Sequence, residues 1–232
     1  GLARARAERA AKASRVADYT SLDKPRAMSL VVMTALTAMV FAGRSLPPAW
    51  LVLATLVGGC LTAAGANALN CFLDRDIDAL MERTRRRPLP AGRLQPARAL
   101  AFGAVLSALG GLALGVFVNW LAAGLALAAS LFYVVGYTAV LKRRTPQNIV
   151  IGGAAGAAAP LIGWAAVAGG LDGAAFLLAA LVLFWTPPHF WALALLAADD
   201  YRRAGVPMMP VSRGEMATRR RIVFYACLAG VA

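Results

Sequence analysis

Six stretches of this chain are apolar, free of Asp, Glu, Lys and Arg, and about as long as a helix that crosses a bilayer. They cover residues 27–43, 48–73, 100–118, 120–141, 149–170 and 173–198, and a crossing requires roughly 20 residues. Because 60% of all residues are hydrophobic, an ordinary soluble domain is excluded. We therefore predict an all-α, polytopic transmembrane helix bundle over residues 27–232, preceded by a basic tail over residues 1–26.

The two ends of the chain carry weaker signals. A seventh apolar run, residues 222–232, is too short to cross a membrane, so we expect an incomplete last helix and about six and a half helices in total. The tail lacks the apolar core of a secretory signal. Its Arg-rich, acid-poor composition faintly resembles a mitochondrial transit peptide, which leaves an organellar origin as an alternative.

The basic residues lie almost entirely in alternate connections between the apolar runs. Of 24 Lys and Arg residues, 23 fall on one side when the runs are threaded in turn, and only Arg44 falls on the other. By the positive-inside rule the first side, which includes the N-terminus, is cytoplasmic. Ten of the eleven acidic residues share it, with Asp172 alone opposite. We therefore expect an active site at the cytoplasmic face of a bacterial inner membrane.

Two kinds of site are not indicated. The net charge of +13 does not predict nucleic-acid binding, because the basic residues lie between membrane runs instead of on one face of a soluble domain. The three cysteines, Cys60, Cys71 and Cys227, form no Cys-x-x-Cys motif and no cluster with histidine. Neither a disulfide framework nor a zinc site is therefore expected.

A row of amide and carboxylate side chains follows the second apolar run. At about 100° per residue, one helical face there carries Asn67, Asn70, Asp74, Asp78 and Glu82, whereas Asp76 points away. Stacked carboxylates repel one another unless a cation lies among them. Mg²⁺ takes oxygen ligands and commonly binds through one or two carboxylates together with a substrate phosphate. The row therefore predicts a Mg²⁺ site in which Asn70, Asp74 and Asp78 are closest to the chemistry.

Cationic residues accompany this row on the same side of the membrane. Guanidinium groups bind phosphate oxygens in bidentate fashion, and an ammonium adds a point charge. We therefore predict a diphosphate site formed by Asn67, Arg83, Arg86, Arg87, Lys142, Arg143 and Arg202. The alternative is that these cations only set the topology and contact anionic lipid.

A second acidic pair, Asp199 and Asp200, follows the sixth run and is again accompanied by arginines. Facing the row, it would supply ligands for a second Mg²⁺ on one diphosphate. The alternative is a pair of solvated acids after a helix.

The single histidine, His189, lies inside an apolar run directly after two prolines. A polar residue within a membrane segment is a functional candidate. It is either a ligand to a bound group or a histidine hydrogen-bonded to a neighbouring helix. Some aromatic residues of these runs could line a cavity, but core packing or interface anchoring is the default expectation for each. They are Trp164, Trp185, Trp191, Tyr133 and Tyr137.

Several longer motifs carry a resemblance to a known family. They are Lys24-Pro25-Arg26; the stretch from Asn70 to Asp78 with Met81-Glu82-Arg83-Thr84 and Arg87-Pro88-Leu89; Lys142-Arg143 with Thr145-Pro146-Gln147-Asn148-Ile149; Thr186-Pro187-Pro188-His189-Phe190-Trp191; and Asp199-Asp200-Tyr201 with Gly205-Val206-Pro207-Met208. Together they extend over nearly the whole chain. It resembles the UbiA-type intramembrane prenyltransferases and, within them, the branch that prenylates heme.

The resemblance implies a bundle of nine helices with a cavity that opens at the cytoplasmic side. It also implies transfer of a farnesyl group from farnesyl diphosphate to the vinyl group of heme b, giving heme O for heme-copper oxidases, with Mg²⁺ as cofactor. His189 and Tyr201 are then the expected heme contacts. Relatives that prenylate hydroxybenzoate carry Asp-x-x-x-Asp at the second acidic site, where residues 199–203 here read Asp-Asp-Tyr-Arg-Arg. The sequence therefore does not identify the ligands of a second metal.

The expected partners are farnesyl diphosphate, heme b and membrane lipid. Heme A synthase, oxidase assembly factors and a second copy of the chain are further candidates, and nucleic acid is not expected. Two alternatives remain: a family member with another aromatic or tetrapyrrole acceptor, and a transporter that uses the acidic row as a cation path.

Overall fold

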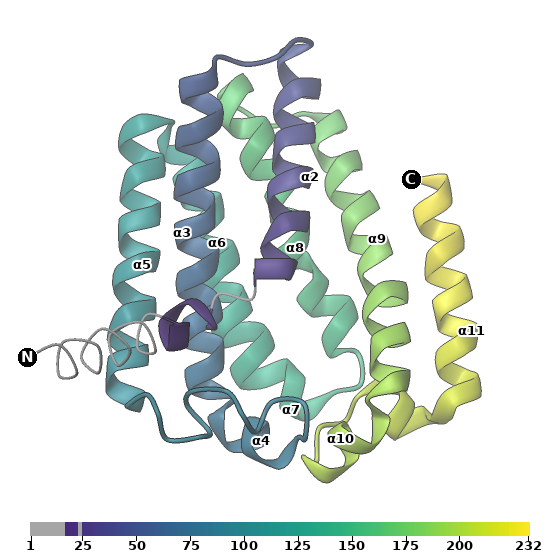
Figure 1. Ribbon diagram of the computed structural model, residues 1–232. Helices are drawn as coiled ribbons and strands as arrows, with labels where there is room; N and C mark the ends of the chain where they lie inside the picture. The colour runs from purple at the N-terminus through teal and green to yellow at the C-terminus, as the bar shows by residue number, and fades with distance from the viewer. Residues whose placement is uncertain (1–16, 23–24) are drawn as a thin grey trace, which may run out of the picture.

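The computed structural model describes residues 17–22 and 25–232, and within these ranges it is helical and contains no strand. The membrane-length helices stand side by side as a bundle (Figure 1). The helices are α2 (Pro25–Gly43), α3 (Ala49–Leu73), α4 (Arg75–Leu80), α5 (Pro96–Phe117), α6 (Trp120–Leu131), η1 (Phe132–Leu141), α7 (Lys142–Arg144), α8 (Asn148–Ala168), α9 (Gly173–Leu196), α10 (Ala198–Arg203) and α11 (Met209–Val231). The predicted all-α bundle is confirmed. Most of the predicted basic tail, and Lys24 with it, lies outside the described residues.

Five helical segments are long and apolar enough to cross a membrane among the residues described: α3, α5, the continuous stretch Trp120–Arg144, α8 and α9. The described apolar part of α2, Met28–Gly43, is shorter. Each of the six predicted runs therefore corresponds to a helix, but apolarity marks the ends of these helices poorly. Thus α5 begins at Pro96, because proline suits the first turn of a helix.

The last helix also differs from the prediction. It begins at Met209, well before the apolar run at 222–232, because Arg219, Arg220 and Arg221 are good helix formers and continue the same helix. Gly214 interrupts it with a φ of 79°, a left-handed conformation that glycine adopts without steric cost.

Small residues let α3 and α5 approach until their backbones touch. A Cβ added at Gly65 would lie 2.6 Å from the carbonyl oxygen of Gly103, and one at Gly110 would lie 2.5 Å from the backbone nitrogen of Thr62. Glycine-mediated contact of this kind is typical of membrane helices, which pack through close van der Waals contact. The pair fixes the position of α3, whose end carries the row.

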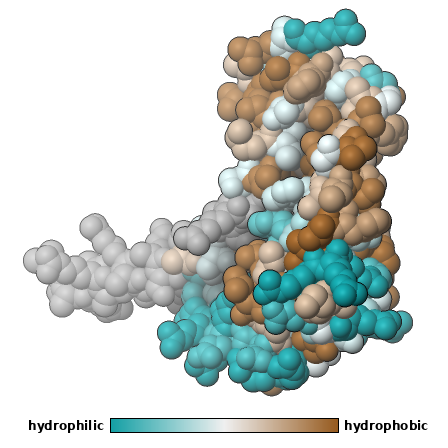
Figure 2. All heavy atoms as spheres, turned by 90° about the vertical axis from the view of Figure 1, so that its right-hand side faces the viewer, coloured by the Kyte–Doolittle hydropathy of each residue, from teal (hydrophilic) through white to brown (hydrophobic). Residues whose placement is uncertain are grey.

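The connections between α3 and α5, between α7 and α8, and between α9 and α11 meet at one end of the bundle, drawn at the bottom of Figure 1. We call it the charged end. Figure 2 shows hydrophilic side chains gathered at this end, below a body that is mostly hydrophobic on the face in view. Most of the predicted site residues follow the membrane runs at this end.

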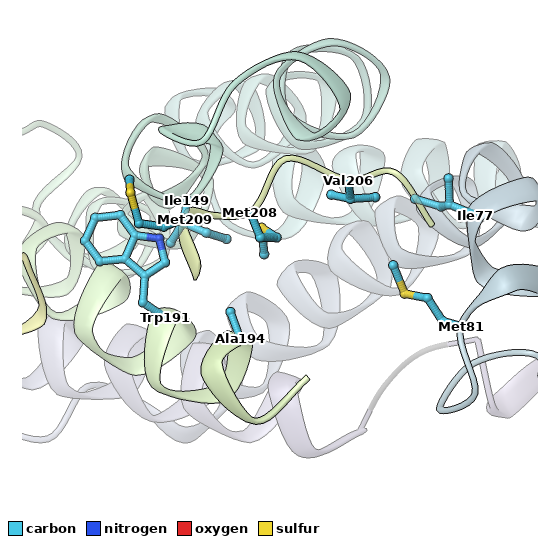
Figure 3. Packing of buried hydrophobic residues seen from close by; sticks show 8 residues of the cluster. All are labelled: Ile77, Met81, Ile149, Trp191, Ala194, Val206, Met208 and Met209. Atoms are coloured by element: carbon cyan, nitrogen blue, oxygen red, sulfur yellow. The ribbon is translucent and has the colours of Figure 1, made fainter. Parts of the chain in front are cut away.

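A core cluster holds the charged end together. It contains Ile77, Met81, Ile149, Trp191, Ala194, Val206, Met208 and Met209, which come from α4 and the loop after it, α8, α9 and the segment that leads into α11 (Figure 3). Trp191 is its largest member and is fully buried. Ile77 lies between Asp74 and Asp78 in sequence, so this packing fixes the turn of backbone that carries both carboxylates.

Candidate functional site

The predicted row exists, although the helix that carries it is interrupted. Helix α3 ends at Leu73, Asp74 is its C-cap, and α4 begins at Arg75. Backbone hydrogen bonds from Asp74 N to Asn70 O (2.9 Å) and from Asp78 N to Asp74 O (2.8 Å) keep helical spacing across the junction. Asn70, Asp74 and Asp78 therefore share one face, and each is at most 3% exposed.

Glu82 does not extend the row, and that prediction is wrong. Helix α4 ends at Leu80, and Met81 is extended with a ψ of 131°. The Glu82 side chain is consequently 71% exposed and pairs with Arg85. Asp76 points away from the row as predicted, because its carboxylate is exposed and bonded to Arg143.

Side-chain cations compensate both carboxylates of the row. Asp74 Oδ2 accepts hydrogen bonds from Lys142 Nζ (2.5 Å) and from Asn70 Nδ2 (2.8 Å). Asp78 Oδ2 accepts one from Arg87 Nη1 (2.7 Å). Repulsion between the acids therefore does not by itself require a metal ion, which corrects that part of the sequence argument. Removing one partner of such a buried pair costs about 3–5 kcal/mol, because the remaining charge is left uncompensated.

One oxygen of the row nevertheless fits a metal ligand. Asp74 Oδ1 is buried and accepts no hydrogen bond from any described residue, and an unsatisfied buried oxygen of this kind calls for an explanation. Within the described part of the chain, no three His, Cys, Asp or Glu side chains form a group that could hold a metal. The residues present therefore fit Mg²⁺ bound by two carboxylates together with a substrate phosphate, and do not fit a cage of protein ligands.

A π-helix leads directly into Lys142, which contacts the row. In an α-helix, residues nine apart such as Tyr133 and Lys142 lie on opposite sides, because nine residues make two and a half turns. The stretch η1 is a π-helix, whose wider turn completes about two turns over the same length. Thr138, in the middle of it, accepts a hydrogen bond from Asn70 Nδ2 (3.0 Å) and donates one to the carbonyl of Tyr133.

The loop after α4, residues 81–95, carries the predicted arginines, and we call it the arginine loop. It packs against the rest of the protein on two sides. Its first part packs through Met81 into the core cluster, and its second part packs through Leu89 and Leu94 against α3. Thr84, which the sequence did not single out, is buried and donates to the carbonyl oxygen of Asp78 (2.9 Å). The sequence alone does not predict such a bond, because nothing but the surrounding motif distinguishes Thr84 from an exposed threonine.

The seven predicted diphosphate residues fall into four groups. Lys142 and Arg87 contact the row, and Asn67 lines the cavity described below. Arg83 and Arg86 are exposed on the loop. Arg143 and Arg202 are bonded to acids outside the row: Arg143 to both oxygens of Asp76, which lowers the pKa of Asp76 to about 2, and Arg202 to Asp199. The structure thus brings only some of them to the row.

The second acidic pair divides into two different environments. The Asp199 side chain is 81% exposed and, among the residues that the structure describes, pairs only with Arg202. The Asp200 side chain is 12% exposed, pairs with Arg203, and accepts hydrogen bonds from the backbone N–H groups of Glu82 (3.1 Å) and Arg83 (3.3 Å). Desolvation raises the pKa of Asp200, but these bonds outweigh it and hold the pKa below its ordinary value. Asp200 thus anchors the arginine loop, and the described residues do not gather it with the row.

A cavity of about 550 Å³ begins one helical turn from the row and extends into the bundle. Its walls come from α2, α3, α6, η1, α8 and α9, and they are mainly Ala, Gly, Val, Leu and aromatic residues. Asn67 lines the cavity and lies one turn before Asn70 on α3. The apolar cavity thus borders the polar, charged row. We call this border, at Asn67, the rim of the cavity.

His189 faces this cavity. Its ring stacks on Trp185, with centroids 4.5 Å apart and planes at 16°, and meets Phe190 edge to face. Among the described residues neither ring nitrogen forms a hydrogen bond, so the alternative of a bond to a neighbouring helix is not observed there. Two prolines precede it without breaking α9, which runs on to Leu196.

Tyr201, the other predicted heme contact, does not line the cavity. It packs against the core cluster. Burial raises the pKa of its phenol, and the charges of Arg83 and Arg87 oppose the rise, so Tyr201 lies within electrostatic reach of the arginine loop. Trp185, Tyr133 and Tyr137 do line the cavity, although the sequence argument assigned such aromatics to core packing.

Comparison with known proteins gives a consistent result. A family model described as the UbiA prenyltransferase family matches residues 31–232. Proteins named protoheme IX farnesyltransferase are similar: that of Symbiobacterium thermophilum is 56% identical over 92% of this chain and 71% of its own length. That of Roseiflexus castenholzii is 53% identical over 92% of this chain, which spans only 40% of that relative.

Solved structures share the fold. The UbiA homolog from Archaeoglobus fulgidus, bound to DMAPP and Mg²⁺, aligns with 92% of this chain and 75% of its own, with a TM-score of 0.80 at 16% sequence identity.

The role of Asp200 as an anchor gives a first prediction. In Asp200→Ala the backbone N–H groups of Glu82 and Arg83 lose their acceptor, so the loop opens more often. We expect trypsin to cleave after Arg85 or Arg86 faster in Asp200→Ala than in the wild-type protein, measured by peptide mass in detergent. Asp199→Ala is the matched control, because it removes a neighbouring acid that contacts no part of the loop. Equal cleavage rates in all three proteins would contradict the anchor.

Proposed function

This chain belongs to the UbiA prenyltransferase family, and we propose that it transfers a farnesyl group from farnesyl diphosphate to the vinyl group of heme b, making heme O. Relatives named protoheme IX farnesyltransferase, 53% to 56% identical over 92% of the chain, support this reaction. The family and the fold alone would also fit another aromatic or tetrapyrrole acceptor. The high identity to these relatives favours heme.

The observation that carries the proposal is the junction of the apolar cavity with the buried row. A prenyl diphosphate has an anionic head and an apolar tail, and the chain offers a place for each: Lys142 and Arg87 at the row, and the cavity beyond Asn67. The cavity volume of about 550 Å³ is in the range of pockets that hold molecules of this size. A transporter is disfavoured, since the membrane runs between the two ends contain no acidic residue.

Asp74 and Asp78 are the residues that would hold Mg²⁺, with the unsatisfied Asp74 Oδ1 as the first candidate ligand. When bound, Mg²⁺ supplies charge neutralisation to the departing diphosphate. Asn70 holds Asp74 in place through its 2.8 Å hydrogen bond. The solved homolog described above was bound to DMAPP and Mg²⁺, which supports a Mg²⁺ requirement here.

The protein's own cations act on the leaving group. The C–O bond of farnesyl diphosphate breaks with its electron pair going to the diphosphate, and Lys142 and Arg87 can donate to those phosphate oxygens. Arg83 and Arg86 lie on the same anchored loop as further donors. The π electrons of the heme vinyl group then form the new C–C bond to the allylic carbon. Water adds to the resulting cation and releases a proton, which leaves the hydroxyethylfarnesyl group.

The cavity walls protect the allylic cation. Apolar side chains exclude water until the vinyl group attacks, and the faces of Tyr133 and Tyr137, which stack at 5.6 Å, attract a cation. We propose that His189 binds the iron of the heme substrate as an axial ligand. Its ring nitrogens form no hydrogen bond with the described residues, and imidazole is a common axial ligand. Tyr201 stays a candidate contact at the rim.

We place the charged end in the cytoplasm of a bacterial cell. The distribution of Lys and Arg supports this orientation. Trypsin sites in the arginine loop should then be cleaved in inside-out membrane vesicles and protected in right-side-out ones. The reverse pattern would contradict the orientation.

Replacing Asp74 tests the reaction most simply. Asp74→Asn keeps the shape of the side chain but removes the charge that holds a metal, so transfer of labelled farnesyl to heme in membranes should fall by more than roughly 100-fold. Asp76→Asn is the matched control: Asp76 is exposed and off the row, and such pairs contribute less than about 1 kcal/mol. Full activity of an Asp74→Asn protein that accumulates normally would refute the proposed role.

The heme contact has a spectroscopic test. We expect the Soret band of heme-loaded protein to shift in His189→Ala, because the iron loses an axial ligand. Trp185→Phe serves as the control, since it keeps a ring beneath position 189 and offers no ligand. An unchanged spectrum in His189→Ala would remove the ligand role while leaving the transfer reaction intact.

A further inference from the structure

Four glycines line the cavity, and they fall into two pairs. A Cβ added at Gly152 would clash with Tyr137 at 2.3 Å, and one at Gly153 would press on Thr186 at 3.2 Å, so these two glycines serve packing. A Cβ at Gly59 or at Gly156 would meet nothing within 4 Å. At these two positions the missing side chain adds to the cavity volume.

Gly59 and Gly156 each lie about two helical turns inside the charged end, on different helices. Gly59 precedes Asn67 on α3 by eight residues, which places it about 12 Å from the rim along the helix axis. Gly156 follows Asn148, the first residue of α8 at the charged end, by eight residues, which gives about 12 Å again. The cavity continues past both, to Thr55 on α3 and Ile162 on α8.

The cavity walls at this depth offer no chemistry that would distinguish two apolar chains of different length. The space available to the chain can distinguish them, because the binding of a hydrocarbon strengthens with the area it buries as long as the cavity has room. A prenyl chain whose head lies at the row would pass its nearer isoprene units along the first part of the cavity. Its far end would reach the level of the two glycines.

We propose that Gly59 and Gly156 set the length of the prenyl chain that this enzyme accepts, by leaving space for the third isoprene unit of a farnesyl group. The inference rests on the proposed function. A larger residue at either position shortens the cavity from within, and it leaves the row, the arginine loop and His189 unchanged. The selectivity then moves from a three-unit chain to the two-unit geranyl chain.

The test compares Gly156→Leu with the wild-type protein, using farnesyl diphosphate and geranyl diphosphate with heme as acceptor. The ratio of kcat/KM for farnesyl over geranyl should fall by about 10-fold or more, the size of effect that a few carbon atoms produce in an apolar pocket. Gly124→Leu is the matched control. Gly124 is also a glycine in an apolar helix with nothing within 4 Å of an added Cβ, but it does not line the cavity, so its ratio should match the wild type.

Each outcome of this experiment has one interpretation. An unchanged ratio in folded Gly156→Leu and Gly59→Leu overturns the inference while the proposed function stands. If the leucine variants do not accumulate, Gly156→Ala and Gly156→Ser should give graded, smaller falls in the ratio, and flat ratios overturn the inference equally. A wild-type protein that transfers neither chain to heme refutes the proposed function, and the inference falls with it.

Discussion

The buried bond between Asp74 and Lys142 is the interaction on which the charged end depends. A carboxylate that is 1% exposed at the end of a membrane helix is costly unless a cation and hydrogen-bond donors reach it. Lys142 reaches it from the segment that directly follows η1, and Asn70 reaches it because helical spacing continues past the end of α3. Thr138, on η1, links the two segments by accepting a hydrogen bond from Asn70.

The same bond shows how cations of the protein compensate the buried charge of the row. Asp74 and Asp78 each use Oδ2 for a cation of the protein, while Oδ1 of Asp74 accepts nothing from the described residues. A prenyl diphosphate offers the phosphate oxygens with which Lys142 and Arg87 can also bond. The metal and the substrate are therefore expected to bind together, with the protein cations shared between the row and the diphosphate.

The sequence predicted the features that depend on local pattern. The membrane runs follow from apolar length, and the face shared by Asn70, Asp74 and Asp78 follows from helical spacing; both are confirmed. The metal at the row stays a prediction. Glu82 was misassigned because the helix ends at Leu80, which the sequence does not mark.

Other features depend on contacts between distant segments and could not be read from spacing. The π-helical turn of η1 is one, since nothing in an apolar run distinguishes it from an α-helix. The anchoring of residues 82 and 83 by Asp200 is another, because it joins positions more than a hundred residues apart. The open space at Gly156 is a third, since Gly152 and Gly153 look the same in sequence and are packed against neighbours.

The central claim is that the row holds its metal jointly with a diphosphate. Binding of Mn²⁺, as a spectroscopic substitute for Mg²⁺, can be followed by electron paramagnetic resonance on the purified protein with and without farnesyl diphosphate. The account predicts weak binding to the protein alone, and binding at least about 10-fold tighter with farnesyl diphosphate, beyond what the diphosphate binds by itself. Tight binding of Mn²⁺ without the diphosphate, or binding that persists in Asp74→Asn, would contradict it.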